Sequence, residues 1–151
     1  IQNMLISHKP ENDGVFTVFQ KIPEELTDKA EILLKFVGLH QKRKLRAGDL
    51  SFGQQKLLEL AMALMDEPKM LLLDEPTAGI NPTLINGIID RLISVNKDYG
   101  ITLLVIEHNM KVIMNLAQRV FCLAHGQMLA NGTPDEIKND KRVLDAYLGA
   151  Q

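Results

Sequence analysis

The chain has 151 residues, of which 46% are hydrophobic and 24% charged, and its formal net charge is −2. A chain of this length is ordinarily one domain with a hydrophobic core, and the composition is typical of a soluble globular protein. Nothing in the charge pattern favours nucleic acid as a partner, because basic residues gather only at Lys42-Arg43-Lys44 and Arg46, which we interpret as a solvated loop.

The cysteine content and the lack of long apolar runs bound the class of protein further. The single cysteine, Cys122, excludes an intramolecular disulfide framework and fits a reducing compartment. Because it stands in an apolar run, we expect a core thiol. No apolar run approaches the length needed to cross a bilayer, and we find no secretory signal. Since the chain begins with Ile1 rather than Met, we interpret it as part of a longer protein.

The first fifty residues predict helices joined by loops. Residues 1–7 suit the end of a helix, and residues 9–14 are typical of a polar loop. Residues 15–22 alternate in polarity, and strand, helix and ordered loop all stay open for them. Residues 24–38 predict a helix with an apolar stripe, and residues 40–48 predict a polar connection. The stripe consists of Leu26, Ala30, Leu33, Leu34 and Val37.

Residues 50–54, with the sequence LSFGQ, open another helix, which we expect from Gly53 to about Asp66. Ser51 is a favourable N-cap, and Gly53 allows a phosphate to approach the backbone closely. The unpaired N–H groups of the first turn and the positive end of the helix dipole then form an anion site. The apolar face of this helix consists of Leu57, Leu58, Ala61, Leu64 and Met65.

The apolar run Met70-Leu71-Leu72-Leu73 predicts a buried strand of a parallel sheet. It ends in Asp74 and Glu75, and open α/β sheets bind ligands at the carboxyl ends of their strands. One carboxylate can hold a hydrated Mg²⁺, which binds proteins through few carboxylates plus substrate phosphates, and the other can orient or deprotonate a water. The alternative is that both residues merely end a strand and cap a turn, which a bare pattern of this kind would favour.

Two further features follow the carboxylates and favour a functional role for them. Ala78-Gly79-Ile80-Asn81-Pro82 is a tight turn into a helix, with Asn81 as N-cap and Pro82 at the first helical position. Residues 101–106 predict a second buried strand, which ends at Glu107 and His108. A lone histidine at a strand end is more often structural, but the position of His108 after this strand favours catalysis. The buried stripe of the intervening helix consists of Leu84, Ile85, Ile88, Ile89 and Leu92.

The last forty residues predict short elements. Asn109 is expected to cap a helix that ends near Leu116. Residues 119–124 and 127–130 predict a hairpin with a two-residue turn. Thr133-Pro134-Asp135-Glu136 has the form of a capping box, and residues 141–148 predict a final helix. Alternating strands and helices indicate an α/β fold with an appended antiparallel hairpin.

These motifs, in this order and with compact spacing, resemble those of the ATP-binding subunit of ABC transporters. LSFGQ is similar to the signature motif, LLLDEP to Walker B, AGINP to the D-loop and His108 to the switch histidine. The resemblance covers essentially the whole chain. Within the family, SFGQQ, AGINP, IEHNM and the tail from ANGTPDEI to AYLG most resemble the branched-chain amino acid importers.

The resemblance implies the C-terminal part of a P-loop (RecA-like) ATPase of the α/β class. A helical subdomain would be followed by parallel strands with flanking helices and a terminal β-hairpin. Residues 1–66 would form the helical subdomain, which includes the signature helix and docks on a membrane partner. Residues 67–151 would form the C-terminal half of the nucleotide-binding core.

The resemblance also implies an ATP- and Mg²⁺-dependent ATPase whose site is shared by two subunits. Asp74 would hold Mg²⁺, Glu75 would act as general base or orient the water, and His108 would bridge the γ-phosphate and water. The signature would bind nucleotide in trans through Leu50, Ser51, Phe52, Gly53 and Gln54. The D-loop contact between subunits would comprise Ala78, Gly79, Ile80 and Asn81. Phe52 departs from the commoner glycine of LSGGQ, which changes local packing.

One part of the ATPase pattern is missing from this sequence: it contains no GxxxxGK[ST] loop to cradle phosphates. We therefore expect this chain alone to be inactive. We also expect exposed strand edges and an uncovered apolar face. The complete subunit would be peripheral on the inner face of the cell membrane, with a second ATP-binding subunit and permease subunits as partners. Alternatives are an ABC ATPase that moves no solute and a catalytically silent interaction fragment.

Overall fold

The computed structural model describes residues 1–7 and 22–148. Of the segments predicted above, the loop at 9–14 and the undecided segment up to residue 21 lie outside the described residues. The chain divides into two compact units, Ile1–Val105 and Ile106–Gln151. Among the described helices, none combines the length and the apolar character that a membrane span requires.

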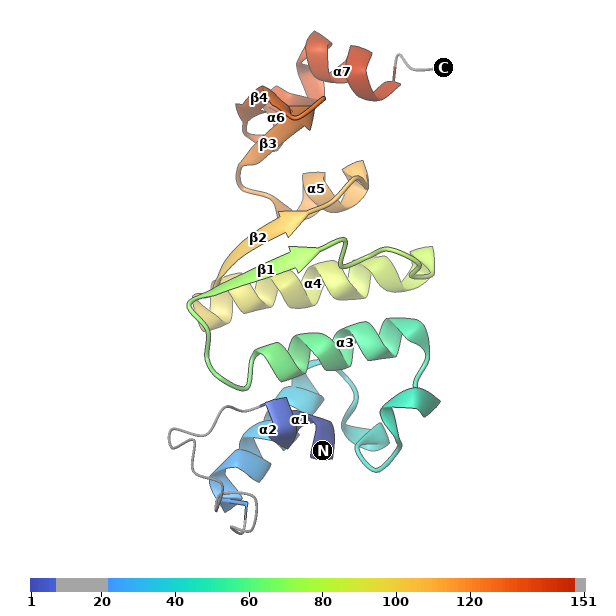
Figure 1. The fold of residues 1–151 in the computed structure, drawn as a ribbon, viewed down its shortest axis with the longest axis vertical. Coiled ribbons are helices and arrows are strands. Elements are labelled where there is room, and N and C mark those ends of the chain that lie inside the picture. Colours follow the sequence, from blue (N-terminus) through green and yellow to red (C-terminus); the bar gives the residue numbers. More distant parts are fainter. Residues whose placement is uncertain (8–21, 149–151) are drawn as a thin grey trace. The chain divides into compact units, whose positions relative to one another are not determined.

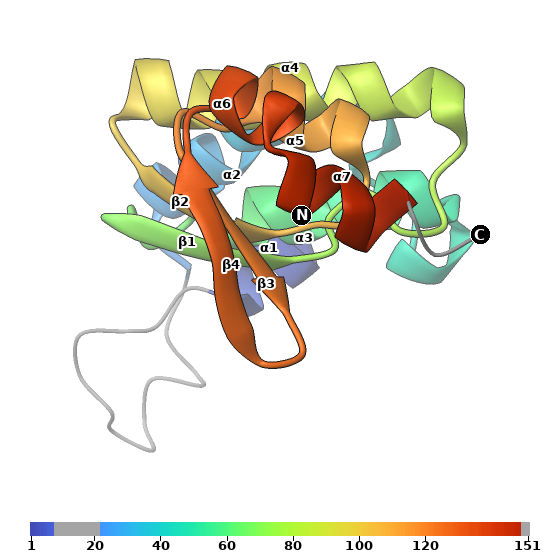
Figure 2. The ribbon, with the colours of Figure 1, turned by 90° about the horizontal axis from the view of Figure 1, so that it is seen from above.

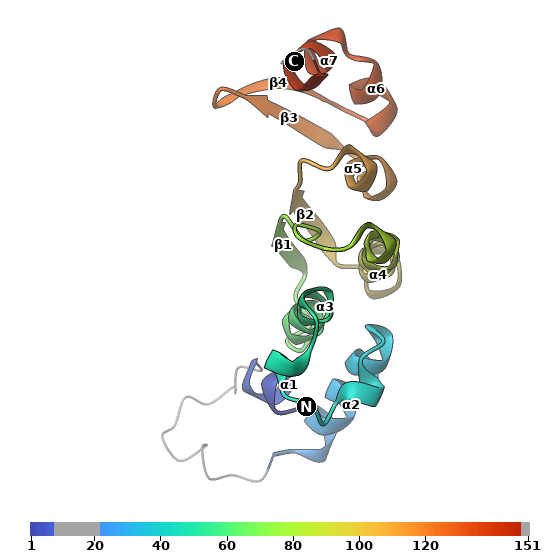
Figure 3. The same cartoon turned by 90° about the vertical axis from the view of Figure 1, so that its right-hand side faces the viewer.

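The first unit begins with three helices that lie beside one another (Figure 1, Figure 3) and share an apolar core. α1 (Gln2–Ser7), α2 (Glu24–Phe36) and α3 (Phe52–Ala63) contact one another pairwise. Two short 3₁₀ helices, η2 (His40–Lys42) and η3 (Ala47–Asp49), lie in the predicted polar connection. The buried side chains of this core include Met4, Ala30, Leu33, Leu34, Leu58, Ala61 and Met65. The predicted apolar stripes of α2 and α3 therefore face each other across it.

Both long helices of this part end earlier than the periodicity predicts. α2 stops at Phe36, and Gly38 follows in the left-handed region at φ +75°, where glycine carries no steric penalty. α3 stops at Ala63, and Glu67 then takes φ +47°. The Glu67 carboxylate forms an ion pair with Lys29 on α2, and this pair links the segment after α3 to α2.

The second half of this unit is a β–α–β arrangement. β1 (Met70–Asp74) and β2 (Thr102–Ile106) are neighbours in a two-stranded sheet, and their arrows run in the same direction in Figure 1. α4 (Pro82–Tyr99) connects them and lies along one side of the strands (Figure 2). It ends at Gly100, which caps it at φ +68°. The parallel strands confirm the predicted α/β fold class.

The sequence predicts that both strands are buried, but each strand has an exposed face in the structure. Leu71 is 8% exposed, whereas Leu72 is 72% exposed and Leu104 is 49% exposed. Side chains alternate across a strand, so one face packs and the other meets solvent because no described element covers it. Leu84 on α4 is also half-exposed rather than buried, while Ile85, Ile88, Ile89 and Leu92 are buried as predicted. This matches the uncovered apolar face that we expect from the sequence.

The second unit is a hairpin with three short helices, α5 (Met110–Leu116), α6 (Pro134–Asn139) and α7 (Lys141–Leu148). β3 (Val120–Ala124) and β4 (Gln127–Gly132) pair antiparallel, with a register irregularity between Cys122 and Leu123. The turn residues between the strands both take positive φ, as a two-residue hairpin requires. The core consists of Val120, Cys122, Ala130, Ile137 and Val143. Cys122 is thus a buried core thiol, as predicted, and its burial raises its pKa.

Candidate functional site

Asp74 and Glu75 lie at the carboxyl end of β1, as the sequence predicts. Asp74 is the last residue of the strand, and both side chains are exposed. Glu75 takes φ +44°, a left-handed conformation that is uncommon for a residue other than glycine. Such backbone strain persists where the surrounding structure enforces it and is concentrated at functional sites. The strand end therefore presents two carboxylates from a sharp, strained turn.

The turn after the carboxylates is held by its own backbone and by the start of α4. The N–H of Ala78 donates to the Glu75 carbonyl at 3.0 Å, and the N–H of Ile80 donates to the Thr77 carbonyl at 3.2 Å. Asn81 caps α4 as predicted: its Oδ1 accepts from the N–H of Thr83 at 3.0 Å. Glu75 and the D-loop thus form one short hydrogen-bonded segment.

The residues of LSFGQ form the N-terminus of α3. Ser51 is the N-cap, and its N–H donates to Gln54 Oε1 at 3.2 Å in a capping-box arrangement. Leu50 precedes the cap in an extended conformation. Ser51 and Phe52 are exposed, and Phe52 has Lys56 Nζ at 5.7 Å from its ring centroid. An exposed, capped helix N-terminus is suited to binding an anion, as the sequence predicts.

The structure also packs the start of α3 against the D-loop, a contact that sequence reasoning missed. A Cβ on Gly79 would lie 3.2 Å from Phe52 Cε1. In the other direction, a Cβ on Gly53 would lie 3.4 Å from Leu84 Cδ1 and 3.7 Å from Ile80 Cγ2. Gly53 is buried in this contact, so its missing side chain makes room for apolar groups of α4 and the D-loop. The only signal in the sequence was a glycine in each of two segments.

His108 and its neighbours lie in the second unit, between β2 and α5. His108 is exposed, and Glu107 Oε2 accepts from the N–H of Asn109 at 3.2 Å. Asn109 in turn caps α5 by accepting from the N–H of Lys111 at 3.0 Å. Glu107 therefore supports the start of α5 through this hydrogen bond. The first unit brings together the signature, the two carboxylates and the D-loop, whereas His108 belongs to the other unit.

The carboxylates fit a metal ion that takes most of its ligands from elsewhere. Among the described residues, no group of three or more His, Cys, Asp or Glu side chains is placed to hold a metal ion. Mg²⁺ commonly binds through one or two carboxylates plus substrate phosphates and water. The exposed carboxylate of Asp74 is of this kind, so it can supply a protein ligand to a Mg²⁺ that arrives with a nucleotide.

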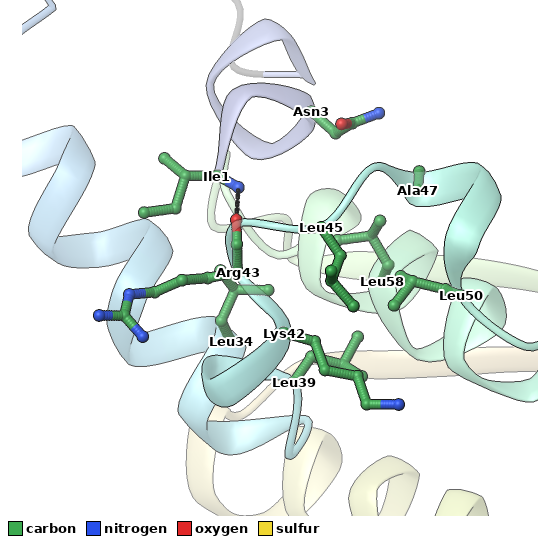
Figure 4. Close-up of a pocket in the computed structure, with 10 residues that line it drawn as sticks. All are labelled: Ile1, Asn3, Leu34, Leu39, Lys42, Arg43, Leu45, Ala47, Leu50 and Leu58. Carbon is green, nitrogen blue, oxygen red and sulfur yellow. Dashed lines mark hydrogen bonds between the residues drawn. The ribbon is translucent and has the colours of Figure 1, made fainter.

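A small pocket in the first unit does not have the chemistry of a phosphate site. It lies where α1, α2 and α3 meet, and Figure 4 shows the terminal amine of Ile1 donating to the Arg43 carbonyl at 3.0 Å at its edge. Its walls are largely aliphatic, from Leu34, Leu39, Leu45, Leu50 and Leu58. Lys42 and Arg43 also line it, but Figure 4 shows their charged ends pointing away from the aliphatic side chains. We therefore place the candidate site at the exposed signature and strand end instead.

The sequence model of the family described as ABC transporter matches residues 2–78. The chain belongs to the ABC transporter family. A second model, described as branched-chain amino acid ATP-binding cassette transporter, matches residues 127–151. Both matches confirm the family resemblance that the motifs indicate, and the first spans the signature, the Walker B strand and the start of the D-loop.

Relatives of this ABC family member include two proteins named LivG. The chain is 35% identical over 156 residues to the high-affinity branched-chain amino acid transport ATP-binding protein LivG of Salmonella typhimurium. It is 37% identical over 158 residues to the probable branched-chain amino acid transport ATP-binding protein LivG of Methanocaldococcus jannaschii. Each match covers 99% of this chain and 61% of the relative. The chain thus spans less than two thirds of their length.

Solved structures of ABC family members have the same fold. The chain is similar to an ATP-binding cassette of an ABC transporter in its ADP conformation, with a TM-score of 0.81 and 34% identity over 98% of this chain and 61% of that one. A nucleotide-free ATP-binding cassette gives a TM-score of 0.75 at 34% identity, over 97% of this chain and 61% of that one. These neighbours confirm the predicted ABC ATPase fold.

Proposed function

We propose that the complete protein is the ATP-binding subunit that energises an ABC importer for branched-chain or related amino acids. The observation that carries this proposal is the position of Asp74 and Glu75 at the end of β1, joined through the D-loop to the exposed N-terminus of the signature helix. The names of the LivG relatives support the substrate class. Phosphoryl transfer needs mostly positioning and charge stabilisation, and these groups are of the kinds it uses.

In this proposal ATP is bound between two subunits. The signature residues of one subunit, from Leu50 to Gln54, contact the γ-phosphate of a nucleotide held mainly by the other. The N-terminal end of α3 and the exposed Ser51 are suited to that anion. Gly79 and Asn81 contact the partner subunit at the D-loop. They connect the two composite sites, each of which is an ATP site formed by residues of both subunits.

Hydrolysis in each composite site would divide among three side chains. Asp74 would hold Mg²⁺, which neutralises charge that develops on the phosphate oxygens. Glu75 would orient the attacking water and take its proton. His108 would bridge the water and the γ-phosphate and so hold the transition state in place. This assignment rests on the family motifs together with the exposed carboxylates at the strand end.

The complete assembly would place this subunit at the inner face of the cell membrane. Permease subunits and a second ATP-binding subunit would be its partners, and we propose no role for nucleic acid. Residues 1–66 would form the helical subdomain that meets the permease, and residues 67–151 would belong to the nucleotide-binding core. The three-helix core and the βαβ arrangement of the first unit are compatible with this division.

The experiment that tests the proposal is Ser51→Arg in the full-length protein. We expect ATP turnover to be lost while the isolated subunit still binds ATP, because Ser51 would meet nucleotide only when two subunits close on it. Turnover is measured as phosphate release, and binding by calorimetry. The matched control is Ala63→Arg, which adds the same single cation at the exposed last residue of α3, about three turns further along the helix. Wild-type turnover by Ser51→Arg would show that the signature does not act in trans.

A further inference from the structure

The start of α3 and the D-loop interlock through two glycines. Gly79 of the D-loop faces the ring of Phe52, and Gly53 of α3 faces Ile80 and Leu84. In each segment a glycine thus packs against an apolar side chain of the other segment. Gly53 and Ile80 are buried in this contact, whereas Phe52 is 52% exposed. Gly79 is itself exposed, beside the ring of Phe52.

Two features of the structure disfavour any residue other than glycine at position 79. The φ of Gly79, +68°, favours glycine over any other residue. In addition, a Cβ there would lie 3.2 Å from Cε1, 3.7 Å from Cδ1 and 3.9 Å from Cζ of Phe52. The first of these distances is shorter than about nine in ten Cβ contacts in proteins. The Phe52 ring is itself held near Lys56, whose ammonium pairs with Glu59 at 3.0 Å.

We propose that Phe52 is a positioning residue that fixes the D-loop against the signature helix of the same subunit. This inference rests on the function proposed above. The D-loop leads directly back to Glu75 through the hydrogen bond from the Ala78 N–H. With Phe52 in place, the signature that serves one composite site and the Glu75 that serves the other move as one body. An aromatic residue in the signature and a glycine in the D-loop therefore form a complementary pair.

A double-mutant cycle on ATP turnover of the full-length protein tests the pair. Gly79→Ala should lower kcat by about tenfold or more, because the added methyl meets the ring and displaces the D-loop. In a Phe52→Ala background the same substitution should cost at least about threefold less, since residues in contact are coupled. Phe52→Ala alone should lower kcat and leave ATP binding to the isolated subunit unchanged. Single effects that simply multiply in the double variant would overturn the proposal.

Gly100→Ala supplies the matched control for backbone strain. Gly100 has the same φ of +68°, yet a Cβ there would meet nothing within 4 Å. Gly100→Ala should therefore reduce thermal stability without lowering kcat, and its effect should be the same in the wild-type and Phe52→Ala backgrounds. If Gly100→Ala and Gly79→Ala lower kcat equally, strain alone explains the D-loop variant, and the role of the ring is refuted.

A second readout separates this inference from the proposed function. The same cycle is measured in the midpoint of thermal unfolding, and turnover is measured well below the lowest midpoint. If the wild-type protein hydrolyses no ATP, the proposed function fails, while coupling in the unfolding midpoints still tests the contact. If the wild-type protein is active and both cycles are additive, only the positioning role of Phe52 fails. If the two substitutions are coupled in the unfolding midpoint but leave kcat per folded molecule at the wild-type value, the contact only stabilises the fold. That result would also refute the positioning role of Phe52.

Discussion

Glu75→Gln is the perturbation that isolates the proposed general base from the rest of the site. Glu75 is exposed and follows β1 at φ +44°. The amide is close in size to the carboxylate, so neither the turn nor the packing of the D-loop should change. It cannot accept a proton and pulls less strongly on the attacking water. We therefore expect the variant to bind ATP and to lose nearly all hydrolysis.

The expected loss can be bounded from both sides. General-base catalysis contributes roughly 10²- to 10⁴-fold in rate, which corresponds to about 2.7 to 5.4 kcal/mol of transition-state stabilisation. Exposed substitutions of this type usually change the free energy of unfolding by less than about 0.5 kcal/mol. A hundredfold loss of kcat therefore cannot arise from unfolding. The assay is steady-state phosphate release at saturating MgATP, alongside the unfolding midpoint.

The same substitution should also change assembly. Removing one negative charge that would face the γ-phosphate reduces like-charge repulsion in the closed state. The variant should then accumulate as an ATP-bound dimer, which size-exclusion chromatography with and without ATP detects. Wild-type turnover, or a variant that stays monomeric at saturating ATP, would refute the role assigned to Glu75.

Glu67→Gln provides a control with the same chemistry and the same backbone geometry. Glu67 is also an exposed glutamate at positive φ, +47°, but it lies in the exit of α3 and pairs with Lys29. Its pKa is lowered by the hydrogen bond from Lys29 and by the charge of that lysine. Glu67→Gln should therefore alter this ion pair and leave kcat unchanged. An equal loss of turnover in both variants would mean that a charge change anywhere on this surface suffices.

Three further outcomes follow from the same assignments. Asp74→Asn in the full-length protein should raise the Mg²⁺ concentration that half-maximal turnover requires, and a magnesium titration with the wild-type midpoint would contradict the role of Asp74 as ligand. The 151-residue chain by itself should bind MgATP weakly and hydrolyse none, and phosphate release above a buffer blank would contradict this. The hydrogen bond from Arg142 lowers the pKa of Asp140 from 3.8 to about 2, so its contribution to stability is present above pH 3.8 and lost as the pH falls towards 2. Asp140→Asn should remove that part of the acid dependence of the unfolding midpoint, and identical acid profiles would refute it.

Much of the local structure could be predicted from the sequence because local chemistry sets it. Asn81 followed by Pro82 begins α4, and Gly100 ends it, since caps and breakers act within one turn of the residues that carry them. The Thr133 capping box begins α6 in the same way. Parallel strands with carboxylates at the end of β1 also follow from the apolar run and its termination.

The burial of the strands could not be predicted from the apolar run alone. Leu72 is as apolar as Leu71, yet one is exposed and the other buried. Alternation decides only which side chains share a face, and whether that face is covered depends on elements far away in the chain. Leu84 is half-exposed for the same reason, although its spacing on α4 matches the buried stripe.

The sequence by itself determined the family, the order of the motifs and the residue types available for phosphate and metal chemistry. Only the tertiary structure decided that Phe52 lies against Gly79 and that Gly53 lies against Ile80 and Leu84. These residues are far apart in the chain, and no local propensity relates them. Their contact arises because α3 and the start of α4 pack closely enough that each must present a glycine, and close packing is a property of the folded chain alone.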